Sequence, residues 1–264
     1  MTLSPPTIQN ILSFSGFDPS GGAGIQADIE TISALGGHAT PVITATTVQN
    51  TQNVDAVFPT DVHLFQQQID KLAEDMTFAA IKIGLLGNIE ITQAVVRFLR
   101  KQNLPVVFDP VLASGAGDVF STHAHIQVIK SELLPWVTLI TPNRFEARQL
   151  TGQSNLDQCA QVLHQQGCRH VLITGTDETP ESDTHVHHRF YANANKPIIL
   201  RAKRLPHAYH GSGCTLASAI AYHICHLPYL DAIKAAQAYT WRTLASSHQI
   251  GRGQRIPNRV SPHV

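Results

Sequence analysis

The sequence predicts an α/β protein, a three-layer α/β/α sandwich with a mostly parallel central sheet. Short apolar, β-branched segments alternate with longer segments in which apolar residues recur every three or four positions. Such alternation is typical of a parallel sheet whose crossover helices cover both faces. A chain of 264 residues can bury one core of this kind, and we expect a single domain over residues 1–264.

The first strand is expected over residues 7–15, followed by a glycine-rich segment and a helix that ends at Gly36 and Gly37. The apolar face of this helix is expected to consist of Ile25, Ile29, Ile32 and Leu35. Further strands are expected over residues 41–47, 79–83, 105–108, 138–140 and 170–174. The intervening helices are expected from a cap at Thr60 to about residue 76, then near 91–99, 126–129, 146 and 155–166.

The pattern changes after Gly175. Segments 187–192 and 197–202 are typical of a β-hairpin, and the chain then becomes helical, with a last helix over 231–248. Residues 113–118 form a small-residue loop and 177–183 a polar one, while 251–264 are expected to be irregular.

Polar residues and glycines gather where the expected strands end. Ligands of open parallel sheets bind beyond the carboxyl ends of the strands, so this clustering predicts one cleft along one sheet edge. The residues concerned are Asp18, Gln49, Gly84, Asp109, Asn143 and Gly175.

The segment 210–215, His-Gly-Ser-Gly-Cys-Thr, is a tight glycine loop that opens a helix. The free N–H groups of such a loop and of the first helical turn form a positive pocket suited to phosphate. We expect the Cys214 thiol to ionise more easily there, because a helix N-terminus favours the thiolate. The alternative is an ordinary small-residue helix start with a buried, inert cysteine.

Three other motifs leave alternatives open. Segment 21–24, Gly-Gly-Ala-Gly, follows a strand and opens a helix, as a phosphate-binding loop does. It lacks the lysine of the GxxxxGK[ST] P-loop and the GxGxxG spacing of a dinucleotide-binding fold. A tight turn or a close approach of the backbone to a ligand therefore explains the glycines equally well. Asp109 is either catalytic or a turn cap. Asn143 and Glu146 either hold Mg²⁺ through water or cap a short helix.

Three histidines, His185, His187 and His188, form the remaining candidate cluster. They could bind a metal, although an exposed loop and hairpin with solvated histidines is the default interpretation.

Composition excludes several function classes. Lysine plus arginine equals aspartate plus glutamate at 19 each, so no net charge favours nucleic acid or an anionic membrane as partner. The four cysteines form no CxxC pair, and no apolar run is long enough for a membrane span or a secretory signal. We therefore expect a cytoplasmic protein.

Six segments, 16–28, 48–51, 82–86, 109–111, 141–147 and 210–215, together resemble the hydroxymethylpyrimidine/phosphomethylpyrimidine kinases of thiamine biosynthesis, members of the ribokinase-like superfamily. The resemblance runs in order from about residue 10 to residue 255. It implies an ATP- and Mg²⁺-dependent kinase that phosphorylates 4-amino-5-hydroxymethyl-2-methylpyrimidine and then adds a second phosphate to the monophosphate. It also implies a homodimer.

The resemblance also implies roles for particular residues. The pyrimidine site would comprise Gly16, Ala23, Asp28, Gln49, Leu85 and Val111. Asp109, Asn143 and Glu146 would lie on the phosphate and Mg²⁺ side, with Asn143 and Glu146 holding the metal through water. Gly211, Ser212 and Gly213 would form the anion hole, and Cys214 would be the catalytic base.

The sequence departs from the family pattern at three places. Leu85 replaces a frequent methionine with similar volume and apolarity, so we expect little effect. Segments 112–115 and 174–177 each lack a lysine that many relatives carry, and the candidate replacements are Lys82, Arg144 and Lys203. Two rival functions stay open: a pyridoxal kinase on the same fold, and a non-catalytic regulator that binds a pyrimidine or a nucleotide.

Overall fold

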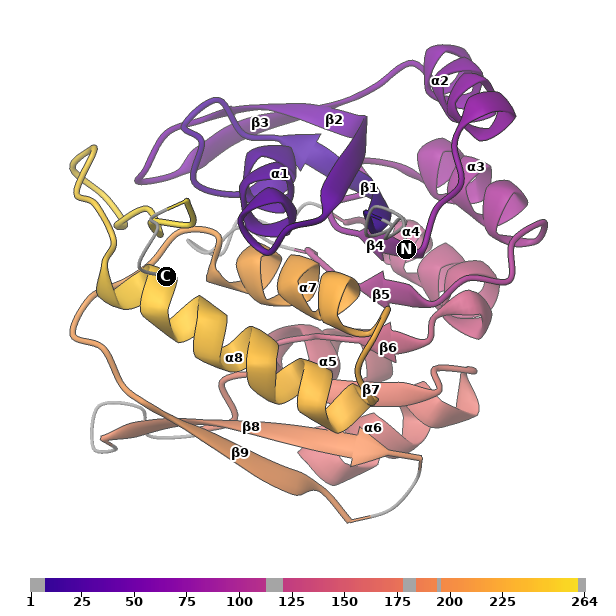
Figure 1. Ribbon diagram of the computed structural model, residues 1–264. Helices are drawn as coiled ribbons and strands as arrows, with labels where there is room; N and C mark the ends of the chain where they lie inside the picture. The colour runs from indigo at the N-terminus through magenta and orange to yellow at the C-terminus, as the bar shows by residue number, and fades with distance from the viewer. Residues whose placement is uncertain (1–7, 113–120, 178–183, 194–195, 261–264) are drawn as a thin grey trace, which may run out of the picture.

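The computed structural model describes residues 8–112, 121–177, 184–193 and 196–260, and Figure 1 shows the arrangement of their elements. Nine strands form one sheet in the order β3-β2-β1-β4-β5-β6-β7-β8-β9. Six adjacent strands pair in parallel, in the spatial order β2, β1, β4, β5, β6 and β7. The strand β3 at one edge and the strands β8 and β9 at the other edge pair antiparallel. The mostly parallel sheet expected from the alternation is confirmed.

The strands are β1 (Asn10–Phe17), β2 (His38–Gln49), β3 (Val54–Pro59), β4 (Ala80–Ile83), β5 (Val106–Phe108), β6 (Leu139–Ile140), β7 (His170–Ile173), β8 (His185–Ala192) and β9 (Ile198–Lys203). The α-helices are α1 (Gly24–Ala34), α2 (Val62–Asp75), α3 (Ile89–Leu99), α4 (His123–Val128), α5 (Arg144–Thr151), α6 (Leu156–Gln165), α7 (Ser212–His223) and α8 (Tyr229–Ala245). A π-helical turn (Ile129–Leu133) and a 3₁₀ turn (Leu134–Trp136) follow α4.

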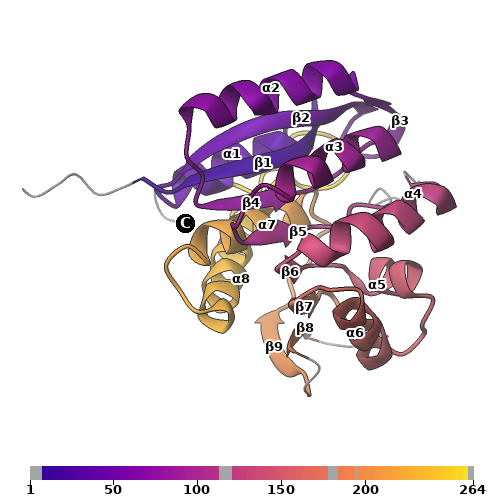
Figure 2. The same ribbon diagram turned by 90° about the vertical axis from the view of Figure 1, so that its right-hand side faces the viewer.

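Helices cover both faces of the sheet, α1, α7 and α8 on one and α2 to α6 on the other (Figures 1 and 2). The core is correspondingly divided into two clusters of buried apolar residues. Successive strand residues point to opposite faces, so in β5 Val106 and Phe108 join the cluster under α3 while Val107 joins the cluster under α7. This alternation of buried residues explains why both faces of a strand such as β5 are apolar, although β1 and β4 also bury polar side chains.

Two features of the first half of the chain differ from what the sequence predicts. The sequence analysis contains no strand at the position of β3, most of whose residues are exposed or half-buried. This strand extends the sheet edge by pairing with β2. The cap of α2 is Asp61 rather than Thr60, since its carboxylate accepts hydrogen bonds from the N–H groups of His63 (3.0 Å) and Leu64 (2.9 Å).

The buried face of α1 also differs from the expected stripe. Ile25 and Ile32 are buried, but Ile29 is 38% exposed, and the fully buried side chain beside it is Asp28. A helix that buries a carboxylate in place of an isoleucine must supply that carboxylate with partners. These partners are described with the site below.

The last helix and the tail differ in detail from expectation. The helix α8 begins two residues earlier and ends three residues earlier than expected, at Tyr229 and Ala245. The described part of the tail, residues 251–260, forms no helix or strand and only isolated β-bridges, but Arg259 within it is almost completely buried. The expected loop 113–118 and most of 177–183 lie outside the described residues. Within the described ranges, no helix has the length and apolarity that a membrane crossing requires.

Candidate active site

A cavity of about 550 Å³ lies at the carboxyl ends of the parallel strands, where the sequence predicts a cleft. Its size is that of a typical small-molecule site. Of the thirteen residues to which the resemblance assigns a role, all except Asp28 line it. These lining residues are Gly16, Ala23, Gln49, Leu85, Asp109, Val111, Asn143, Glu146, Gly211, Ser212, Gly213 and Cys214.

One wall of the cavity is the N-terminus of α7. Gly211 precedes the helix with a φ of +76°, and a side chain there would collide with the carbonyl of Gly22 and the guanidinium of Arg259. The first intrahelical bond runs from Thr215 N–H to the Gly211 carbonyl at 3.0 Å. The N–H groups of Ser212, Gly213 and Cys214 therefore precede the helix's own bonding pattern, as an anion-binding helix start requires.

Cys214 lies at the start of two helices at once. Its sulfur lies in the cavity wall with Gly24, the first residue of α1, and with Asp109, and both of these groups influence its ionisation. Burial nevertheless raises the pKa of the thiol to about 12, although the charge of Lys82 and the Gly24 N–H oppose that rise. The expectation that this thiol ionises more easily than usual is therefore wrong for the unliganded protein.

Asp109 and Glu146 bring two carboxyl groups to the cavity. Burial raises the pKa of Asp109 to about 6, while Lys82 opposes the shift. Burial, with the nearby Asp109 charge, raises the pKa of Glu146 to about 8, against hydrogen bonds from the N–H groups of Asn143 and Leu112. Two buried, mutually repelling carboxyl groups lose that repulsion when a cation binds between or beside them.

The capping interpretation of Asn143 and Glu146 is confirmed. Asn143 Oδ1 accepts from the N–H groups of Phe145 (2.8 Å) and Glu146 (2.9 Å), and Glu146 Oε2 accepts from Asn143 N–H at 2.8 Å. In the described part of the chain, no three His, Cys, Asp or Glu side chains lie close enough to hold a metal directly. The carboxyl groups of Asp109 and Glu146 are donors that fit a cation such as Mg²⁺, which keeps most of its waters and needs few carboxylates.

Asp28 lies behind the cavity wall and is fully buried, so its expected contact with the pyrimidine is wrong. Its Oδ1 lies 2.8 Å from the ammonium of Lys82, which is also fully buried. Lys82 accordingly cannot reach a phosphate in the cavity. The structure therefore gives this pair a place beneath the site rather than in it.

Of the other two cations considered for the missing lysines, only Lys203 lines the cavity. Arg144 instead places its guanidinium 4.8 Å from the centre of the Phe145 ring. Arg204, which the sequence analysis missed, also lines the cavity and pairs with Asp177 at 2.9 Å. Lys203, the last residue of β9, and Arg204, the residue after it, therefore supply positive charge to the part of the cavity that they line.

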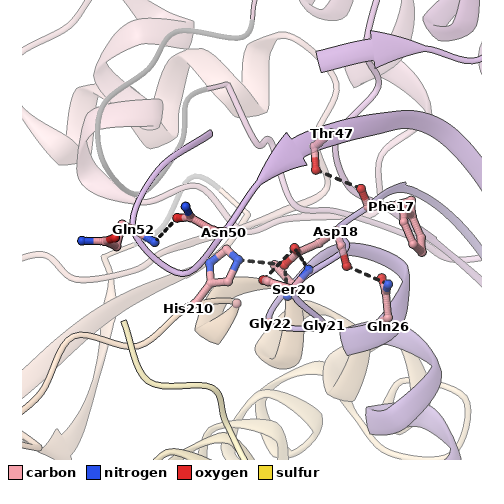
Figure 3. A network of polar contacts seen from close by, with 12 residues as sticks. Phe17, Asp18, Ser20, Gly21, Gly22, Gln26, Thr47, Asn50, Gln52 and His210 are labelled. Carbon is pink, nitrogen blue, oxygen red and sulfur yellow. Dashed lines mark hydrogen bonds and ion pairs between the residues drawn. The ribbon is translucent and has the colours of Figure 1, made fainter. Parts of the chain in front are cut away.

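The sequence analysis also missed a pair between two cavity-lining loops (Figure 3). His210 Nε2 lies 2.8 Å from Asp18 Oδ2, which also accepts a hydrogen bond from Ala23 N–H at 2.8 Å. The ring of His210 lies against the Cα of Gly22, where a side chain has no space. This close approach of the protein's own side chain accounts for the glycine at position 22, and it is neither of the alternatives left open above. Burial opposes ionisation of Asp18, but hydrogen bonds from His210 and Ser20 outweigh it and lower the carboxyl pKa to about 2.

The three clustered histidines do not share one environment. His187 Nδ1 lies 2.5 Å from Asp177 Oδ1, whereas His188 lines the cavity and its Nδ1 accepts a hydrogen bond from Gly175 N–H at 3.1 Å. Burial lowers the pKa of His188 to about 4, so its ring is neutral at pH 7. The interpretation as solvated surface is wrong for His188, because the cavity reaches this end of β8.

The C-terminal tail closes the cavity beside Gln49. Gly253 N–H and Gln254 N–H donate to the side chain and the carbonyl of Thr51, at 3.0 and 2.8 Å. Gln254 itself lines the cavity. The sequence offered no signal for this contact, because it joins residues about two hundred positions apart.

Comparisons with known proteins show which family this chain belongs to. The sequence profile described as phosphomethylpyrimidine kinase matches residues 18–258. The chain is 38% identical over 253 residues to the hydroxymethylpyrimidine/phosphomethylpyrimidine kinase of Synechococcus elongatus, covering 92% of this chain and 94% of the relative.

Two solved structures show the same fold. The chain resembles the pyridoxal kinase of Bacillus subtilis, solved as an ADP complex, with a TM-score of 0.87, 25% identity and coverage of 98% of this chain and 100% of that one. It resembles phosphomethylpyrimidine kinase from Clostridium difficile 630 with a TM-score of 0.75, 31% identity and coverage of 88% and 98%. The ribokinase-like α/β fold is confirmed, and the chain, a phosphotransferase, belongs to the phosphomethylpyrimidine kinase family.

Proposed function

We propose that this protein uses ATP to phosphorylate the hydroxymethyl group of 4-amino-5-hydroxymethyl-2-methylpyrimidine, and then phosphorylates the monophosphate to the diphosphate, in thiamine biosynthesis. The observation that carries the proposal is the meeting of Cys214, the N-terminus of α7 and Asp109 in one cavity. The family match over residues 18–258 supports it.

The pyrimidine end of the cavity is the part lined by Gly16, Gln49, Leu85 and Val111. An aminopyrimidine edge offers a donor, the amino group, beside an acceptor, the ring nitrogen. The amide of Gln49 can satisfy both at once because it carries an acceptor oxygen and a donor nitrogen. The apolar side chains of Leu85 and Val111 provide surfaces against which a planar ring can pack.

The first phosphoryl transfer requires removal of a proton from the substrate hydroxyl. The hydroxyl oxygen attacks the γ-phosphorus of ATP in line, the bond from phosphorus to the bridging oxygen breaks, and ADP leaves with that electron pair. The sulfur of Cys214 takes the hydroxyl proton. The neighbouring carboxylate of Asp109, whose pKa is about 6, can take the thiol's own proton as the sulfur accepts the new one.

The α7 N-terminus holds the transferred group. The N–H groups of Ser212, Gly213 and Cys214 provide donors for the charge that develops on the equatorial phosphoryl oxygens. Mg²⁺, when bound, would neutralise phosphate charge, and Asn143 and Glu146 are the residues that would hold it through water. Lys203 and Arg204 add positive charge toward the nucleotide. The ADP complex of the Bacillus subtilis pyridoxal kinase supports ATP as the phosphate donor.

The second transfer differs because its nucleophile is already ionised. A phosphate monoester has a second pKa of about 6, so its oxygen needs no base at neutral pH. We infer that Cys214 acts as a base chiefly in the first transfer, whereas the Gly211–Gly213 backbone serves both.

A pyridoxal kinase is the second candidate, because the structure with a TM-score of 0.87 is a pyridoxal kinase. The experiment that separates the two measures both phosphorylation rates with the pyrimidine alcohol and pyridoxal present together. Our proposal predicts preferential consumption of the pyrimidine alcohol, and preferential consumption of pyridoxal would contradict it. A homodimer and a cytoplasmic location stay predictions.

A further inference from the structure

The C-terminal tail places a buried guanidinium, that of Arg259, behind the start of α7. Its side chain is fully buried, so its N–H groups need acceptors within the protein. Nε donates to Thr215 Oγ1 at 2.8 Å, Nη1 donates to Glu30 Oε2 at 3.0 Å, and Nη2 donates to the Gly22 carbonyl. These acceptors belong to the first turn of α7, to α1 and to the loop after β1, so one planar group joins three segments.

The contact with Thr215 extends to the backbone of the anion hole. Because a guanidinium can only donate, Thr215 Oγ1 accepts from Arg259 and donates its own proton to the Gly211 carbonyl at 2.8 Å. Thr215 N–H donates to the same carbonyl at 3.0 Å. This carbonyl belongs to the rigid peptide unit that carries the Ser212 N–H. The orientation of one anion-hole donor is therefore set through Thr215 and Arg259.

The contact with Gly22 restrains the same glycine from its other side. The Gly22 carbonyl oxygen lies so close to the Cα of Gly211 that a Cβ has no space there, and Arg259 Nη2 stands 2.9 Å from that Cβ position. Arg259 is itself anchored by α8, since the Tyr239 hydroxyl donates to its carbonyl at 2.9 Å. The Gly211 peptide is thus held by both of its neighbours.

The charge of Arg259 favours an anion at this place. A cation near the N-terminus of a helix opposes the helix dipole, so the stability of α7 alone gives no reason for an arginine here. Its ion pair with Glu30 compensates little, because the Glu30 side chain is 40% exposed. An anion bound at the start of α7 would remove the unfavourable interaction.

We propose that Arg259 is a positioning residue for phosphoryl transfer, which orients the Gly211–Ser212 peptide so that the N–H groups of the anion hole stay aligned on the phosphoryl group. Arg259 acts through Thr215 and Gly22. The benefit to catalysis rests on the proposed function, whereas the restraint on the start of α7 depends only on the geometry described here.

Hydrogen exchange followed by mass spectrometry tests this restraint without any substrate. The full chain is compared with Arg259→Met, and we expect the amides of the first turn of α7, from Thr215 onward, to exchange about tenfold faster in the variant. The amides of α3 should exchange at the wild-type rate, which shows that the rest of the fold is intact. Equal exchange in the first turn of α7 would overturn the proposal.

Kinetics test the consequence for the reaction, with rates normalised to the folded fraction. In Arg259→Met, kcat for the pyrimidine alcohol should fall about 10- to 100-fold, the effect of a displacement of about 1 Å, while the KM for the alcohol stays within about threefold. A merely structural role would reduce the folded fraction and leave kcat unchanged. Arg259→Lys should lose as much kcat, because an ammonium cannot bridge the three acceptors. Wild-type kcat in either variant would overturn the proposal.

Arg255→Met is the matched control, since the Arg255 guanidinium lies in the same tail but donates to the Ser247 hydroxyl at 2.9 Å and to the Ser247 carbonyl at 2.6 Å. Its kcat should stay within about twofold of the wild-type value. An equal loss of kcat in Arg255→Met and Arg259→Met would contradict the proposal, because any loosening of the tail would then suffice.

Thr215→Val tests the same connection if Arg259→Met does not fold, because it keeps the shape of the side chain and removes the hydroxyl between Arg259 and Gly211. Its kcat should fall at least about threefold with little change in KM, whereas Thr215→Ser should keep the wild-type kcat. An unchanged kcat in Thr215→Val would overturn the proposal. Absence of ADP formation by the wild-type chain with the alcohol would instead contradict the proposed function and leave the exchange result valid.

Discussion

His210 Nε2 lies 2.8 Å from Asp18 Oδ2, and this contact joins the loop after β1 to the loop that opens α7. Asp18 is 2% exposed, and its other hydrogen bonds hold segment 20–23 in place. The pair therefore fixes the two loops that bracket the proposed anion hole (Figure 3).

Removal of the His210 ring should lower the free energy of unfolding. His210→Ala leaves a buried carboxylate without one partner, a change that typically costs about 1–3 kcal/mol. Because the pKa of Asp18 is depressed to about 2, its stabilising contribution is complete above the ordinary carboxyl pKa and is lost as pH falls through 2. Urea denaturation at pH 7 measures the difference, and His63→Ala, at an exposed position of α2, is the control. Equal stability of both variants would contradict the expectation.

Substitution of Cys214 should separate the two transfers. Cys214→Ala is expected to reduce phosphorylation of the alcohol by about 10²–10⁴-fold, the usual value of a general base, and that of the monophosphate by less than about tenfold. Separate initial rates with each acceptor measure this, and Cys225→Ala is the matched control. Equal losses in both reactions would refute the division of roles, although the kinase assignment would stand.

Glu146 should make the unliganded protein less stable as pH rises. Its carboxyl is protonated in the folded protein up to a pKa of about 8 but ionises near its ordinary value when unfolded. The folded state therefore holds the extra proton between these values, and stability falls as pH rises through the window. Relative to Glu146→Gln, the wild-type protein should lose on the order of 3–4 kcal/mol between pH 5 and 8. Parallel stability curves for the two proteins would contradict this, and Mg²⁺ should reduce the difference.

Gln49 should control the affinity for the pyrimidine but not for ATP. Gln49→Met keeps the approximate volume of the side chain and removes both hydrogen-bonding groups, so the KM for the pyrimidine alcohol should rise about tenfold or more. The KM for ATP should stay near the wild-type value. Gln127→Met, at an exposed position of α4, is the control. An unchanged pyrimidine KM would remove Gln49 from the proposed recognition site.

Much of this architecture could be predicted from the sequence. Regular apolar patterns in the sequence mark the buried strands β4, β5 and β7 and the apolar face of α3. The burial of these elements follows the expected periodicity. The cavity could also be located, because glycines and polar residues mark the strand ends there.

Other features depend on contacts that periodicity does not encode. The resemblance places Asp28 in the pyrimidine site, but its burial depends on Lys82 from β4, two serines from β1 and one serine from α7. Likewise, the thiol of Cys214 was expected to ionise easily from its helix position alone. The structure adds burial, which raises its pKa more than the helix start and Lys82 lower it. Local sequence cannot report either balance.

Formation of ADP in the presence of the pyrimidine alcohol tests the central claim most directly. The full chain is incubated with ATP and Mg²⁺, with and without 4-amino-5-hydroxymethyl-2-methylpyrimidine, and ADP and the phosphorylated pyrimidines are separated and quantified. We predict that ADP appears only with the alcohol, first in step with the monophosphate and later with the diphosphate. ADP formation that is independent of the alcohol, or absent in its presence, would contradict the account.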